Sequence, residues 1–137
     1  MRRLTATLCL TLAVLLGSAF IPPPTPLAAQ EISQLCEELL AMEIEINKST
    51  PRDIDEFTVL ISVGVNCSLS IVKYTKQITA DGNLLALGWK ERKQRQHTQL
   101  HCNQVGMAST QNWTSVDVLF DINWNYLVTF TTTPGDC

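Results

Sequence analysis

The strongest strand pattern in the chain runs from Phe57 to Ile78, and the flanking segments can be arranged around it. Two runs rich in β-branched residues, at about 55–65 and 69–78, flank the short polar joint Asn66-Cys67-Ser68, which is typical of a β-hairpin. In a regular strand alternate side chains share a face, and here that face is apolar throughout: Phe57, Val59, Ile61, Val63 and Val65. An apolar face needs a cover, so the pattern predicts helices from the flanking segments.

Helical periodicity precedes the hairpin and follows it. Apolar residues recur at helical spacing from Ile32 to Leu40, which predicts a helix over about 31–47. After the turn residues at 81–83, a second helix is predicted over about 84–101. It begins apolar, but residues 90–99 carry no apolar side chain. The second half of this helix is therefore expected to lie mostly in water.

Two further strands are predicted near the end of the chain. Apolar residues alternate from Val116 to Ile122 and again from Tyr126 to Phe130. Residues 48–53 and 103–112 are expected to be loops. The predicted order of elements is α-β-β-α-β-β, and the predicted fold class is α+β: one small domain of antiparallel hairpins covered by two helices and braced by two disulfides.

The N-terminal residues have the pattern of a secretory signal peptide. Arg2 and Arg3 precede an apolar run, and small residues precede Gln30. This pattern predicts a cleaved signal peptide over residues 1–29, with cleavage after Ala19 as the alternative. The apolar run is shorter than the roughly 18 residues of a spanning helix, so no transmembrane segment is expected after cleavage. Residues 30–137 are expected to form one exported domain, periplasmic or extracellular.

Four cysteines lie within the expected exported domain: Cys36, Cys67, Cys102 and Cys137. An even number in a small exported domain predicts two disulfides, and the spacings do not suit a zinc site. If the connections are short, the predicted order of elements brings all four sulfurs to one end of the domain. The pairing stays open at this point, although the helix ends favour Cys36–Cys102, with Cys67–Cys137 joining two strand ends.

Charge narrows the range of partners. Loss of Arg2 and Arg3 with the signal peptide leaves eight Lys and Arg against 13 Asp and Glu, a formal net charge of −5, which argues against nucleic acid as the main partner. A positive cluster stands out within the second predicted helix: Lys90, Arg92, Lys93 and Arg95. A solvated helix face is the simpler interpretation. If the protein contacts an acidic partner, this cluster is the best candidate surface in the chain.

Aromatic residues and histidines supply the remaining candidates. Trp89, Trp113 and Trp124 are most simply interpreted as half-buried packing residues, although Trp113 or Trp124, if it lies in a loop, could instead anchor an interface. His97 and His101 are spaced so that both imidazoles share a helical face, as in metal-binding helices. No third ligand is evident, so solvated histidines are the simpler interpretation, and no metal or other cofactor is expected.

The favoured hypothesis is a small exported, disulfide-braced binding or accessory protein that acts by contact with an unidentified protein partner. It rests on the absence of any nucleophile–base or carboxylate pair in the sequence beside a complete structural frame. One alternative is a small metal-dependent hydrolase that uses His97 and His101. Another is an envelope-surface protein that binds anionic groups through the basic helix.

Overall fold

The computed structural model describes residues 27–137, with side chains from Gln34 onward. Residues 1–26, nearly all of the expected signal peptide, lie outside the described residues, so the prediction of a signal peptide remains an expectation. Within 27–137, no helix combines the length and apolar character that crossing a membrane requires.

A five-stranded sheet forms the body of the domain: β1 (Arg52–Asp55), β2 (Thr58–Asn66), β3 (Ile71–Ile78), β4 (Thr114–Phe120) and β5 (Tyr126–Thr132). The strands lie across the sheet in chain order, and all neighbours are antiparallel except β3 and β4, which are parallel. The helices are α1 (Leu27–Lys48), α2 (Trp89–His101) and α3 (Met107–Gln111), with short 3-10 helices η1 (Gly82–Leu84) and η2 (Pro134–Asp136). The predicted single α+β domain is confirmed.

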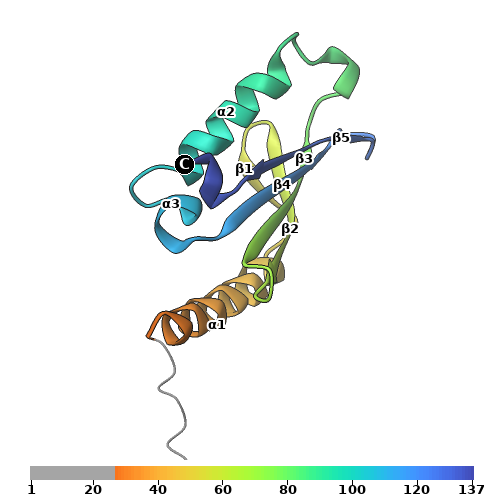
Figure 1. Cartoon of the computed structure of the whole chain (residues 1–137). Helices are drawn as coiled ribbons and strands as arrows, with labels where there is room; N and C mark the ends of the chain where they lie inside the picture. Colours follow the sequence, from red (N-terminus) through yellow and green to blue (C-terminus); the bar gives the residue numbers. More distant parts are fainter. Residues whose placement is uncertain (1–26) are drawn as a thin grey trace, which may run out of the picture.

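The two long helices cover different halves of one sheet face. The strand register places Val63, Tyr74, Asp117 and Phe130 in one row across four strands, and residues in such a row share a face. On this helix-covered face, α1 packs along β2, whereas α2 packs along β5 (Figure 1). The predicted cover of two helices is therefore present, but the helices lie apart from each other.

The alternation predicted for the first strand breaks at Ile61. Leu60 pairs with Lys76 but Ser62 pairs with Thr75, so Ile61 is the extra residue of a β-bulge. The bulge exchanges the two faces of the strand beyond it. Leu60 and Val63 are each only 3% exposed, whereas Phe57 is 63% exposed. The prediction that Phe57, Val59, Ile61, Val63 and Val65 share one face was therefore wrong.

Three element boundaries also differ from the prediction. Residues 84–88 are not part of the second helix, because Gly88 adopts a left-handed conformation (φ 71°) at the N-cap and α2 begins at Trp89. The expected loop 103–112 contains α3. The last two residues of the expected loop 48–53 belong to β1. All four residues of β1 are exposed, so its sequence has no alternation of buried and exposed residues from which a strand could be predicted.

The two predicted disulfides form, but with a pairing that was not the favoured one: Cys36–Cys67 and Cys102–Cys137. The favoured Cys36–Cys102 bridge was wrong because α1 and α2 lie on different halves of the sheet. One bridge ties α1 to the β2–β3 turn, and the other ties Cys102, directly after α2, to the C-terminal residue. The strand register places both bridges at the end of the sheet where β3 and β4 begin and β5 ends.

The core is divided in the same way as the helices. Under α1, a cluster of large apolar residues fills the space: Leu39, Leu60, Val63, Val72 and Trp113. Trp113 is only 1% exposed, so it belongs to this core and is not the interface anchor considered above. Under α2 the apolar cluster is smaller, consisting of Ile78, Leu119 and Phe130. We call these the sealed half and the open half.

Candidate functional site

A groove of about 690 Å³ opens in the open half, between α2 and the β1–β2 turn. Ile54 and Phe57 line the side formed by β1 and the turn, and Trp89 and Leu100 line the α2 side. Ile78, Leu119 and Phe130, the three residues of the smaller core, form its apolar floor. We refer to this feature as the groove.

The sequence of α2 explains why the groove is not filled. Trp89, Lys93, Gln96, His97 and Leu100 line the groove, and their spacing places them on one helical face. Only the first and last of these residues are apolar, so the middle of the helix presents polar side chains to the sheet. A helix with this face cannot seal the apolar floor as α1 does in the other half.

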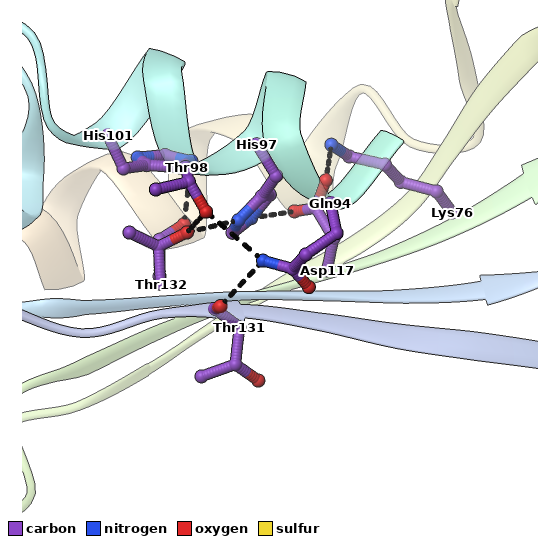
Figure 2. Close-up of polar contacts among 9 residues, drawn as sticks. Lys76, Gln94, His97, Thr98, His101, Asp117, Thr131 and Thr132 are labelled. Carbon is purple, nitrogen blue, oxygen red and sulfur yellow. Dashed lines mark hydrogen bonds and ion pairs between the residues drawn. The ribbon is translucent and has the colours of Figure 1, made fainter. Parts of the chain in front are cut away.

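Polar side chains meet beside the groove in a connected network (Figure 2). Lys76 Nζ donates to Asp117 Oδ2, and Asp117 Oδ1 faces His97 Nε2 at 3.7 Å. His97 Nδ1 lies 2.7 Å from Thr132 Oγ1 in a hydrogen bond. Within the described residues, His97 Nε2 and Asp117 Oδ1 have no hydrogen-bond partner. Two buried polar atoms thus face each other across a gap too long for a direct hydrogen bond.

The charges of the network shift its pKa values. Burial acts to raise the pKa of Asp117, but His97 and the Lys76 ammonium outweigh this effect and hold that pKa below its usual value. Burial also lowers the pKa of His101, and the neighbouring His97 lowers it further. Asp117 is therefore an anion and His101 a neutral imidazole at neutral pH.

The network has the connectivity of a nucleophile, a base and an orienting carboxylate, but the hydroxyl in the place of the nucleophile is buried. Thr132, in the position of the nucleophile, is 0% exposed. Ser115, whose Oγ lies 2.9 Å from His101 Nε2, is also 0% exposed. A nucleophile must reach its substrate, so both hydroxyls hold the histidines in place instead.

The two histidines selected from the sequence are close together, with ring centroids 4.5 Å apart. His97 is buried and His101 half-buried, so the expectation of solvated histidines was wrong. The reason is that both face the sheet, where Thr132 and Ser115 bind them. Among the described residues, no group of three His, Cys, Asp or Glu could hold a metal ion.

The four residues of the basic cluster lie on different sides of α2. Lys93 lines the groove, whereas Lys90 lines a second hollow beyond the start of α2. Arg92 Nη1 donates to the carbonyl oxygen of Leu87 at 3.0 Å, and Arg95 is exposed away from the groove. Positions 90, 92, 93 and 95 fall at different angles around the helix axis, so the four residues do not form one surface.

Sequence analysis missed Lys76 and Asp117. The alternation of Val116, Val118 and Phe120 drew attention to the opposite face of β4, but Ser115, Asp117 and Leu119 are the buried set. The sequence did contain a signal. Each of these two residues lies in a β-rich run, and the residues two positions before and after it, which share its face of the strand, are uncharged. The two charges are opposite in sign. Such pairs on neighbouring strands could have been proposed as an ion pair.

Known proteins resemble this chain in fold. No protein-family profile matches the chain, and no curated protein matches its sequence. Among solved structures, a presumed secreted protein of Pseudomonas aeruginosa superposes with a TM-score of 0.59 at 15% identity, covering 82% of this chain and 98% of its own. The pilotin EpsS of the Vibrio vulnificus type 2 secretion system superposes with a TM-score of 0.60 at 8% identity, covering 80% and 96%. At these identities the likeness extends to the fold alone.

Proposed function

We propose that this protein is a small exported accessory protein that works by binding a protein partner, with the groove as the binding site. The observation that carries the proposal is an apolar groove of about 690 Å³ left open on a domain braced by two disulfides. Binding sites are typically concave and mostly apolar, with a few polar groups that fix orientation. Lys76, His97 and Asp117 are polar groups of this kind within the groove.

The charges at the rims of the groove indicate what kind of partner would fit. Lys93 lies on the α2 rim, while Asp55 and Glu56 lie on the opposite rim. A segment with an apolar face toward the floor, acidic residues toward Lys93 and basic residues toward the β1–β2 turn would match both rims. An amphipathic helix provides such an arrangement, so we expect a helical segment of a partner protein.

The exported setting has two supports. The expected signal peptide is one, and the two disulfides are the other, since such bridges form and persist in oxidising compartments. Both support an exported protein, and we propose that it works in the periplasm or outside the cell. The likeness to a pilotin makes a component of a secretion system the first partner to test.

Site-specific photo-crosslinking tests the binding site in cells that export the protein. A photoreactive amino acid at Phe57 or Leu100 would stand on opposite sides of the groove, and the same substitution at Leu40 on the exposed side of α1 is the matched control. We expect both groove positions to yield one shared adduct, identified by mass spectrometry. An adduct from Leu40 with none from the groove positions would overturn the proposal.

A further inference from the structure

We propose that Lys76 sets the specificity of the groove, and that it selects a partner helix whose apolar face is interrupted by one uncharged hydrogen-bond acceptor. Asparagine, glutamine, serine and threonine side chains carry such an acceptor. This inference rests on the proposed function and deepens it. The rims define the charges along the two sides of the partner helix, whereas Lys76 defines the residue that faces the floor between them.

Lys76 lies among apolar residues in the middle of the sheet. The strand register places it between Leu60 on β2 and Leu119 on β4, which are only 3% and 6% exposed. Lys76 itself lines the groove, and its side chain is 22% exposed, compared with 11% for Asp117 and 4% for His97. Of the three polar residues at the floor, Lys76 is therefore the one that a bound helix can reach most directly.

The ammonium group of Lys76 has hydrogen-bond donors to offer a ligand. Such a group carries three N–H donors. Among the described residues, Nζ has one acceptor, Asp117 Oδ2, and it lies 5.3 Å from the centre of the Tyr74 ring. In the free protein, water can accept from the other donors, because the side chain is partly exposed. A helix that covers the floor displaces this water, so it must supply an acceptor or leave a charged donor unpaired at a cost in binding free energy.

Asp117 makes an uncharged acceptor the better ligand. Its carboxylate neutralises the Lys76 ammonium, so the ion pair as a whole carries no net charge. A carboxylate from the partner would bring a second anion beside Asp117 and away from water, where like charges repel strongly. Lys93, the other lysine that lines the groove, lies on the rim. An amide or hydroxyl oxygen accepts from Lys76 without adding a charge.

The rest of the network supports this arrangement from below. Asp117 Oδ1 faces His97 Nε2 at 3.7 Å, and Thr132 binds the other ring nitrogen of His97. Both facing atoms are buried, so a bound helix would meet the Lys76 ammonium and not these two atoms. Asp117 is thus a positioning residue that fixes Lys76 Nζ at the floor. This role would explain why an ion pair that costs free energy to bury is kept in an apolar groove.

Selection from a phage-displayed library of designed amphipathic helices tests the inference without knowledge of the natural partner. Each helix has about 18 residues, which is long enough to be helical in isolation. Its two sides carry charges that match the rims, and the central positions of its apolar face are randomised. We expect helices selected on the exported, disulfide-bonded protein to contain one asparagine, glutamine, serine or threonine at these positions.

Two variants of the ion pair should change what is selected. Asp117→Asn leaves the charge of Lys76 unpaired with little change of side-chain shape, so selection should turn to aspartate or glutamate. Lys76→Met/Asp117→Leu replaces the pair with apolar side chains of similar size, which buried pairs often tolerate, and should select fully apolar faces. Lys73→Met, the same change on the opposite face of β3, is the matched control and should select the same helices as the wild type.

Titration calorimetry then measures the contact itself. Replacing the polar residue of a helix selected on the wild type with leucine should weaken its binding to the wild type about tenfold or more, because hydrogen bonds to charged groups are strong. The same replacement should not weaken binding to Lys76→Met/Asp117→Leu. Circular dichroism and the melting temperature show whether each variant is folded. If a variant is not folded, the residues selected on the wild type decide the question.

Fully apolar faces selected on the wild type would overturn the inference, and so would a predominance of aspartate or glutamate there. Leu100→Arg separates this failure from failure of the groove, because Leu100 lines the groove and is exposed. Helices that lose binding to Leu100→Arg but are indifferent to the ion pair would keep the groove and remove Lys76 from its specificity. Helices indifferent to both, or a library that yields no binder, would count against the proposed function as well.

Discussion

Under α1 the sheet is covered by a continuous apolar core, whereas under α2 the same face of the sheet carries charged and hydroxyl side chains. Leu39 and Trp113 close the sealed half. The open half instead places His97, Asp117 and Thr132 beside a groove. Both halves have a disulfide at the same end of the sheet, so the covalent frame does not account for the difference.

The comparison separates a half that is filled with apolar side chains from a half that holds the proposed binding site. Burying charged groups costs free energy even when they are paired, so an apolar set in the open half would be as stable or more so. The sealed half supplies apolar burial that the open half lacks. We infer that the open half keeps its polar residues for orientation of a bound segment, which would explain the incomplete cover by α2.

The largest expected effect on stability comes from the sealed half. Trp113→Ala would leave a cavity in the larger core, because this side chain is 1% exposed and is the largest of the fully buried residues. We expect the free energy of unfolding to fall by about 3–5 kcal/mol, measured by chemical denaturation. Trp124→Ala is the control, since an exposed position should change stability by about 0.5 kcal/mol or less. Similar losses for both variants would contradict the assignment of Trp113 to the core.

Removal of single disulfides tests whether the two halves are held alike. Cys36 and Cys67 are 31 residues apart and Cys102 and Cys137 are 35 apart, so loop closure predicts nearly equal contributions of about 3–4 kcal/mol. We expect Cys36→Ser/Cys67→Ser and Cys102→Ser/Cys137→Ser to lower the free energy of unfolding by similar amounts. Partner binding at the groove should suffer more in the second variant, because that bridge ties down the end of α2.

A smaller effect is expected from the polar network. Asp117→Asn removes the anion that pairs with Lys76, and loss of such a buried interaction typically costs about 1–3 kcal/mol. The folded state lowers the pKa of Asp117, so its contribution is fully present above the unfolded pKa of about 3.9 and is lost as the pH falls through the folded value.

The free energy of unfolding of the wild type should therefore decline in acid below about pH 4 more steeply than that of Asp117→Asn. The control is Glu56→Gln, an exposed carboxylate at the groove rim. A parallel decline in the wild type and in Asp117→Asn would contradict the network. In that case the open half, like the sealed half, would not owe its stability to a buried ion pair.

Hydrophobic periodicity predicted those elements of the fold that are defined by residues close together in the chain. The helix over 31–47, the hairpin around Cys67 and the last two strands were all expected, because periodicity records which side of an element is buried. The bulge at Ile61 was not predictable, since it is defined only by register with β3. The disulfide pairing depended on the separation of α1 and α2 across the sheet, which no local pattern contains.

The candidate site was predicted only in fragments. His97, His101 and Lys93 were selected, but for metal binding or for a basic surface. The groove exists because β1, α2 and the middle of the sheet converge, and β1 gave no signal in the sequence. Asp117 lies on the buried face of β4 although the opposite face has the more regular apolar alternation. The candidate site thus lies on the face of β4 with the less regular pattern.

The smallest change in stability is expected from reversing a single charge on α2. Such variants distinguish a partner that contacts the groove from a partner that responds to the overall charge of the helix. Lys93→Glu and Arg95→Glu make the same charge change two residues apart, but only Lys93 lines the groove. Both should alter the free energy of unfolding by about 0.5 kcal/mol or less, because both side chains are exposed.

Only Lys93→Glu should weaken binding of the partner identified by crosslinking. The expected loss is up to about fivefold, equivalent to the ~1 kcal/mol that an exposed ion pair can contribute, and it should be larger at low salt. Titration calorimetry at two salt concentrations measures it. Equal losses in both variants would mean that the partner responds to the overall charge of α2. The contrast between an open, recognising half and a sealed, stabilising half would then lose its main functional support.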